Sequence, residues 1–133
     1  MLAEAVVDAS VVVRGLTTDG DAADVLDQIA VGATVGHAPD LLVAEVSNAL
    51  AVAVRAERRS LGDAQSLFGL LVAGPIELHS TVPLAPAAIE LAATSDITAY
   101  DSFYAVLAAA LDVPLVTADR RMAAAVPGAL RVA

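Results

Sequence analysis

Two aspartates in this 133-residue chain lie at or just beyond the ends of short apolar runs. Asp8 comes after the run AVV, and Asp119 comes soon after the run VPLV. Because the carboxyl ends of parallel strands meet at one edge of a sheet, both carboxylates are expected at that edge, where ligands bind. Each aspartate could instead do no more than cap the helix that follows it.

A glutamate on an apolar helix face is the third unusual acid. Glu45 shares its predicted helix face with Leu41, Ala49 and Val52. Glutamate is rarely buried without a partner, so an arginine salt bridge is one simple explanation. Asn48, one turn further on, could orient the carboxylate or bind backbone.

Asp101 is the fourth such acid and lies near the start of a strongly apolar helix. Residues 103–111 contain no polar side chain except one tyrosine hydroxyl, which predicts a helix that is buried all round. Asp101 would then lie at the edge of the core, although it also has the spacing of a capping box with Thr98.

Four carboxylates in one crevice would require a cation. Two of them ~4 Å apart repel by about 4 kcal/mol at an effective dielectric constant near 20. A donor set made only of oxygen selects a hard ion such as Mg²⁺ or Mn²⁺, which serves in phosphoryl chemistry by activating water. His37 and His79 do not neighbour these acids in the sequence and are expected to be ordinary strand-end histidines.

Apolar segments with strand and helix patterns alternate along the chain. Strands are predicted at 4–8, 34–40, 75–80, 114–117 and 130–132. Helices are predicted at 10–16, 20–32, 40–59, 64–74, 85–94, 99–112 and 119–126. Ser10 is a plausible N-cap for the first helix, and Ser60 has capping-box spacing with Asp63. The alternation predicts one α/β domain over residues 1–133, with a parallel sheet of four or five short strands flanked by helices on both faces.

The composition restricts the function. Mean hydropathy is +0.73, which favours a homodimer or a permanent partner, and the chain has no cysteine. Neither a signal peptide nor a membrane span is evident, so a cytoplasmic protein is expected. The absence of lysine argues against a receiver domain or a haloacid-dehalogenase phosphatase, and no glycine-rich phosphate loop follows the first strand. The net charge of −9 opposes nucleic-acid binding unless cations or a local arginine patch offset it.

Three segments together resemble the PIN-domain ribonucleases of the VapC toxin family: VVDASVVV, HAPDLLVAEVSNAL and ITAYDSFYAVLAAALDVPLVTADRRM. With the short final strand they cover the chain nearly end to end. The resemblance implies a metal-dependent endoribonuclease that acts as the toxin of a type II toxin–antitoxin pair. Its partners would be an RNA substrate and a VapB-like antitoxin.

The resemblance also implies roles for individual residues. The catalytic and metal-binding acids would be Asp8, Glu45, Asp101 and Asp119, with Mg²⁺ or Mn²⁺ as the cofactor. Supporting polar positions would be Ser10, Asn48 and Thr117. The ion would lower the pKa of a water that attacks phosphorus in line, leaving 5′-phosphate and 3′-hydroxyl ends.

Two alternatives remain open from the sequence. The arginines nearest the predicted site, and therefore the candidates for RNA contact, are Arg14, Arg120 and Arg121, but they could equally be solvated or paired with neighbouring acids. The chain could also be a PIN-like protein-interaction module with little or no nuclease activity.

Overall fold

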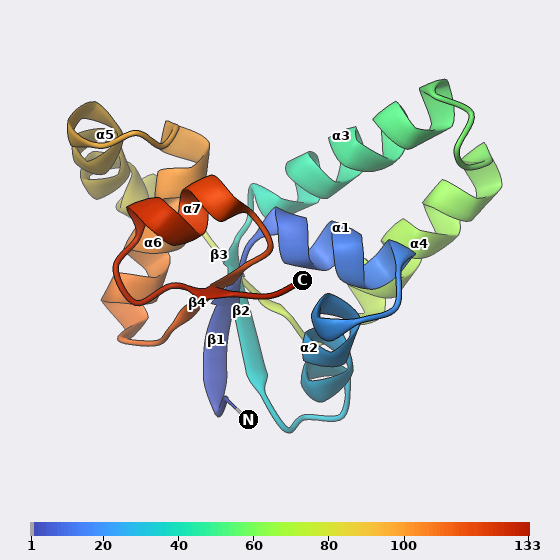
Figure 1. The fold of residues 1–133 in the computed structure, drawn as a ribbon, viewed down its shortest axis with the longest axis horizontal. Coiled ribbons are helices and arrows are strands. Elements are labelled where there is room, and N and C mark those ends of the chain that lie inside the picture. Colours follow the sequence, from blue (N-terminus) through green and yellow to red (C-terminus); the bar gives the residue numbers. More distant parts are fainter. Residues whose placement is uncertain (1) are drawn as a thin grey trace.

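Five short strands form a fully parallel sheet at the centre of the computed structural model, which describes residues 2–133 (Figure 1). The strands are β1 (Glu4–Val7), β2 (Val35–Pro39), β3 (Glu77–His79), β4 (Leu115–Thr117) and β5 (Leu130–Arg131). Their order across the sheet is β3-β2-β1-β4-β5. The predicted parallel sheet of four or five strands is therefore confirmed, and β1 and β4 are neighbours.

Helices cover both faces of this sheet, as predicted. They are α1 (Ala9–Thr17), α2 (Asp21–Ala30), α3 (Leu42–Arg55), α4 (Leu61–Ala73), α5 (Ala85–Thr94), α6 (Ala99–Leu111) and α7 (Arg120–Ala125), with a short 3₁₀ helix, η1 (Val82–Leu84). Figure 1 shows α1, α2 and α4 on one side of the sheet and α5 and α6 on the other. None of the helices within residues 2–133 combines the length and apolarity needed to cross a bilayer.

The central strands are apolar because the sheet is covered on both faces. Val6, Val7, Leu115 and Val116 are almost fully buried. Burying each such side chain stabilises the fold by about 1.5–3 kcal/mol. This core holds β1 against β4 and so fixes where the residues that follow these strands emerge.

Two helix predictions need correction. Helix α6 is not buried all round, since Ala109 and Ala110 are exposed while Tyr104 is buried. It packs against the sheet and α5, which leaves one side open. Helix α3 ends at Arg55 rather than at residue 59, and Glu57 just beyond it has a left-handed φ of 58°.

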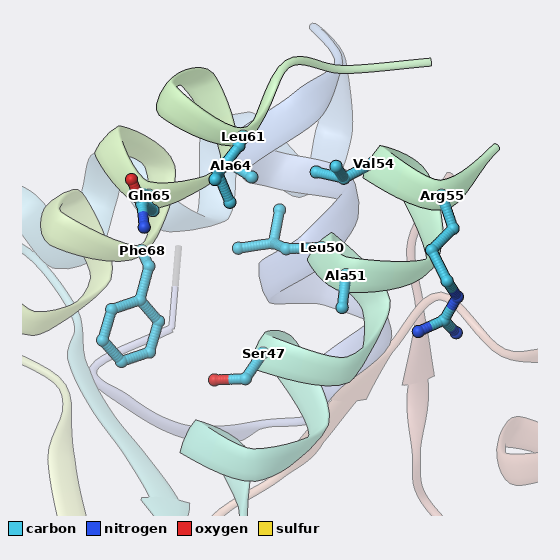
Figure 2. A pocket seen from close by; sticks show the side chains of 9 residues that line it. All are labelled: Ser47, Leu50, Ala51, Val54, Arg55, Leu61, Ala64, Gln65 and Phe68. Carbon is cyan, nitrogen blue, oxygen red and sulfur yellow. The ribbon is translucent and has the colours of Figure 1, made fainter. Parts of the chain in front are cut away.

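Helices α3 and α4 enclose an apolar groove of about 420 Å³ (Figure 2). The residues that line it are Ser47, Leu50, Ala51, Val54, Arg55, Leu61, Ala64, Gln65 and Phe68. Other large apolar side chains are also exposed, among them Leu70, Val72, Val82 and Ile89. This uncovered surface is available for the homodimer or partner predicted from hydropathy, and the dimer itself stays a prediction.

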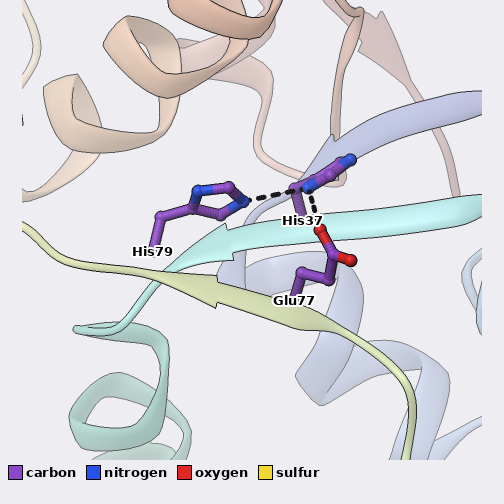
Figure 3. A group of neighbouring side chains, drawn as sticks. All are labelled: His37, Glu77 and His79. Atoms are coloured by element: carbon purple, nitrogen blue, oxygen red, sulfur yellow. Dashed lines mark hydrogen bonds and ion pairs between the residues drawn. The ribbon is translucent and has the colours of Figure 1, made fainter.

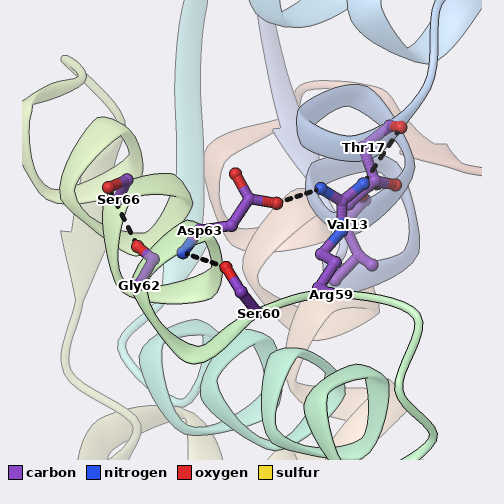
Figure 4. A network of polar contacts seen from close by, with 7 residues as sticks. All are labelled: Val13, Thr17, Arg59, Ser60, Gly62, Asp63 and Ser66. Atoms are coloured by element: carbon purple, nitrogen blue, oxygen red, sulfur yellow. Dashed lines mark hydrogen bonds and ion pairs between the residues drawn. The ribbon is translucent and has the colours of Figure 1, made fainter.

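The turn between α3 and α4 is fixed by local polar contacts (Figure 4). Ser60 is the N-cap of α4, and its hydroxyl accepts a hydrogen bond from the Asp63 backbone N–H at 3.1 Å. Arg59 pairs with the Asp63 carboxylate at 2.7 Å and donates to the Thr17 carbonyl at 3.3 Å. The predicted cap at Ser60 is therefore confirmed.

We expect Ser60→Ala to lower the free energy of unfolding by about 1 kcal/mol, because an N-terminal N–H of α4 loses its acceptor. Urea denaturation measures this. Ser66→Ala is the matched control: its exposed hydroxyl donates to the Gly62 carbonyl inside the same helix, so its loss should change stability by less than about 0.5 kcal/mol. Equal losses in both variants would contradict the capping role.

Candidate active site

Asp8 is the most buried acid of the predicted quartet, with 5% of its surface exposed. It follows β1 and is the N-cap of α1, where Oδ1 accepts from the Val11 N–H at 3.2 Å. The hydroxyls of Ser10 and Thr117 donate to its two oxygens, each at 2.5 Å. The expected N-cap at Ser10 is therefore wrong: Asp8 occupies that position, and Ser10 donates to it.

The same two hydroxyls join the ends of β1 and β4. Ser10 Oγ accepts from the Ala118 N–H at 2.9 Å, and Thr117 Oγ1 accepts from the Asp119 N–H at 3.0 Å. The two hydroxyls lie 3.4 Å apart. The carboxyl edge of the sheet is thus a connected polar network around Asp8.

The other two aspartates also lie at helix N-termini. Asp119 is the N-cap of α7, and its Oδ1 accepts from the N–H groups of Arg121 at 2.8 Å and Met122 at 3.4 Å. Asp101 lies in the first turn of α6, where its N–H donates to the Thr98 hydroxyl at 3.2 Å. Capping therefore occurs at both places, without removing either carboxylate from the site.

Glu45 binds a tyrosine instead of an arginine. The Tyr104 hydroxyl donates to Glu45 Oε1 at 2.6 Å. The face predicted for Glu45 was also wrong, because the buried stripe of α3 is Leu42, Val46 and Leu50, and half-buried Glu45 borders it. Sequence reasoning did not assign Tyr104 a role, although its signal was a lone hydroxyl in an otherwise apolar stretch.

Burial and mutual repulsion act together on these acids. Burial is the main cause that raises the pKa of Asp8, Glu45 and Asp101. Neighbouring carboxylates raise these pKa values further: Asp119 acts on Asp8, Asp101 and Asp8 act on Glu45, and Asp119 and Asp8 act on Asp101. The structure thus brings the four predicted acids into one electrostatic neighbourhood.

The site has the donor chemistry of a hard cation. Within residues 2–133, no arginine comes within ion-pair distance of the four acids, although the Arg121 charge lowers the pKa of Asp101. In the same range, no three of these acids have carboxylate oxygens within 4.8 Å of one another. The side-chain donors that the four acids offer are all carboxylate oxygens, the ligand type of hard cations.

The remaining predicted residues lie at exposed positions. Asn48 lies one turn after Glu45 and lines a shallow pocket with Tyr100. Arg14 is in the last turn of α1, and Arg120 begins α7. The supporting role of Asn48 and the contacts with RNA proposed for Arg14, Arg120 and Arg121 stay predictions.

The fold and its acidic edge define a class of protein. The PIN domain family model matches residues 5–126, a span that contains all four acids.

Sequence comparison narrows that class. The chain is 40% identical over 127 residues to Ribonuclease VapC1 of Mycobacterium tuberculosis, an alignment covering 94% of this chain and 92% of the relative. The chain therefore belongs to the VapC family of PIN-domain proteins, as its sequence motifs indicated.

Solved structures share the fold. PAE2754 from Pyrobaculum aerophilum superposes with a TM-score of 0.77 at 24% identity, covering 98% of this chain and 92% of that one. VapBC2 from Rickettsia felis, solved bound to a DNA fragment from its promoter, gives a TM-score of 0.67 at 15% identity, with 96% of both chains covered. At these identities the likeness concerns the fold.

We expect Glu45→Gln to raise the melting temperature by roughly 2–4 °C at pH 7 in chelator, because it removes a charge that burial and two carboxylates disfavour. Because the pKa of Glu45 is raised in the folded state, its ionised carboxylate destabilises the fold at pH values above that pKa. This destabilisation disappears as the pH falls towards the ordinary value of 4.5. The advantage of the variant should therefore shrink on acidification, as calorimetry at several pH values can measure. Exposed Glu90→Gln on α5 is the control, and a lower melting temperature for Glu45→Gln would contradict this account.

We expect Tyr104→Phe to raise the pKa of Glu45 further, because the Tyr104 hydroxyl stabilises the ionised carboxylate. Carboxyl ¹³C chemical shifts followed during a pH titration measure this directly. The control is Tyr100→Phe, since Tyr100 is exposed and its hydroxyl has no hydrogen-bond partner among residues 2–133. An unchanged Glu45 titration in Tyr104→Phe would show that the hydrogen bond does not hold the carboxylate.

Proposed function

We propose that this chain is a metal-dependent endoribonuclease that acts as the toxin of a type II toxin–antitoxin pair. The observation that carries the proposal is the gathering of Asp8, Glu45, Asp101 and Asp119 from four separate segments, none of them ion-paired to an arginine of residues 2–133. An interaction surface has no need for such a repulsive group. The name of the 40% identical relative, Ribonuclease VapC1, supports the same activity.

The four acids would hold Mg²⁺ or Mn²⁺, which when bound supplies charge neutralisation and a more acidic water for phosphodiester hydrolysis. The hydrogen bonds leave particular oxygens for this task. Glu45 is held through Oε1 and Asp119 through Oδ1, so Oε2 and Oδ2 keep no hydrogen-bond partner in the described chain. Tyr104 orients Glu45 as a candidate acceptor for the proton of the attacking water, while Ser10 and Thr117 fix Asp8.

RNA phosphates would meet the exposed arginines near this edge. Arg120 and Arg121 follow Asp119 at the start of α7, whereas Arg14 lies in the last turn of α1, at the opposite end of that helix from Asp8. The chain has few aromatic residues for base stacking, at 3%, so recognition would depend mainly on the backbone phosphates.

A VapB-like antitoxin is the proposed protein partner. The apolar groove between α3 and α4, with Arg55 in its lining, offers a place for an apolar segment of that partner. A net charge of −9 would favour association with a basic antitoxin segment. A fold neighbour, VapBC2 of Rickettsia felis, was solved bound to promoter DNA, which is consistent with a paired system.

We expect the parent chain to cleave RNA with Mn²⁺ or Mg²⁺ and to stop in excess EDTA. Asp101→Asn and Asp8→Asn should each reduce the cleavage rate by about 100-fold or more, because each removes a charged ligand. Glu90→Gln should cleave like the parent. The assay follows defined transfer, ribosomal and messenger RNAs on gels, and thermal melting with and without metal shows that each variant is folded.

The interaction module predicts a different result. It would leave all three RNA classes uncut, and Mn²⁺ would not raise the melting temperature. Cleavage that persists in both aspartate variants would also overturn the proposal, because a contaminating nuclease would then explain the activity.

A further inference from the structure

A second group of metal-ligating side chains lies on the sheet, away from the four acids. His37 in β2 is in register with Glu77 in β3, and His79 follows two residues later on the same strand. Alternation along parallel strands puts all three side chains on one face. Gly36 abuts Ile29 of α2, so its neighbour His37 faces the opposite side, towards α6.

The three side chains converge closely (Figure 3). His37 Nδ1 lies 3.0 Å from His79 Nε2 and 3.3 Å from Glu77 Oε2. All three ligand atoms lie within 4.8 Å of one another, and no other such group occurs in residues 2–133. Two ligands at a tetrahedral zinc ion are separated by about 3.3 Å, given bond lengths near 2.0–2.1 Å. The spacing of these ligand atoms is therefore close to the spacing of ligands around a bound zinc ion.

A fourth residue, Glu4, contacts the other nitrogen of the His37 ring. Glu4 in β1 places Oε2 2.9 Å from His37 Nε2, the nitrogen that points away from the other two ligands. Metal-binding histidines usually donate this second N–H to a carboxylate or carbonyl, which fixes the tautomer that binds metal. Only 6% of the His37 side chain is exposed, whereas 63% of the Glu77 side chain is exposed, so an ion has a route from solvent.

The hydrogen bonds of neutral His37 cannot satisfy both carboxylates. If Nε2 carries the proton for Glu4, Nδ1 can accept from His79 Nε2–H but offers no proton to Glu77 Oε2, 3.3 Å away. If Nδ1 carries the proton instead, the Nε2 lone pair points at Glu4. A cation bound by Nδ1 and Glu77 removes this conflict and leaves Nε2–H for Glu4.

We propose that His37, Glu77 and His79 form a second metal site that binds Zn²⁺ or another borderline divalent transition metal, with Glu4 as the outer carboxylate that positions His37. Two imidazoles and one carboxylate suit such ions better than Mg²⁺. A bound ion would tie the three-residue edge strand β3 to β2, and through Glu4 to β1.

This site is separate from the acidic edge and does not depend on the proposed nuclease activity. His37 is in register with Val6, two residues or about 6.6 Å along the strand from Asp8. Glu77 and His79 lie on β3, two strands or about 10 Å across the sheet from β1. One ion therefore cannot serve both places.

The test is calorimetric titration of the full metal-stripped chain with Zn²⁺ in the presence of excess Mg²⁺, which occupies hard oxygen sites. We expect one equivalent to bind with micromolar or tighter affinity. His79→Gln and the exposed-site variant Glu77→Gln should each weaken binding at least tenfold, and Glu4→Gln should weaken it about 10–100-fold. Co²⁺ should give the visible absorption bands of a four- or five-coordinate ion in the parent and lose them in His79→Gln.

Asp101→Asn and Glu90→Gln are the controls, and both should bind Zn²⁺ like the parent. Loss of binding in Asp101→Asn with retention in His79→Gln would assign the ion to the acidic edge and overturn the proposal. Absence of Zn²⁺ binding by the folded parent would overturn it as well. Neither result bears on RNA cleavage with Mn²⁺, so this proposal and the proposed nuclease can fail separately.

Discussion

The constraint on which the rest of the structure depends is the burial of the Asp8 carboxylate between two neighbouring strands. A buried charge is costly unless it is hydrogen-bonded. Here the hydroxyls of Ser10 and Thr117 and the Val11 N–H satisfy it. Because those hydroxyls also accept from the backbone after β4, the bonds that satisfy Asp8 align the ends of β1 and β4. The same set of hydrogen bonds thus satisfies the Asp8 carboxylate and fixes the edge of the sheet.

Helix geometry explains how four acids can share this edge. Asp8 and Asp119 are N-caps of α1 and α7, while Asp101 and Glu45 lie in the first turns of α6 and α3. The positive end of each helix dipole stabilises a nearby carboxylate by typically 0.3–1 kcal/mol. Capping and metal binding are therefore not competing explanations of these residues. These four helix starts partly offset the repulsion, while burial first and the remaining repulsion second raise the pKa values of Asp8, Glu45 and Asp101.

Most of the fold could be predicted from local patterns, whereas contacts across the sheet could not. Apolar runs that end in acids indicated the strands and the edge where Asp8 and Asp119 emerge. The Tyr104 partner of Glu45 was missed because it depends on where the sheet places α6 relative to α3, and the two residues are 59 positions apart in the sequence. The contact between His37 and His79 was missed for a similar reason. They meet only through the register of β2 with β3, which the strand pattern does not specify.

The face of the sheet that carries the histidines also carries the acidic edge. Along β1, Glu4, Val6 and Asp8 alternate onto one face, and Val6 is in register with both His37 and Leu115. One polar residue lies at each end of this short strand, with a buried valine between them. Ligand softness then separates the two ends chemically, because oxygen donors favour Mg²⁺ or Mn²⁺ while imidazoles favour ions of the zinc class. Distance and donor type would thus keep the two proposed ion sites apart on one sheet of five short strands.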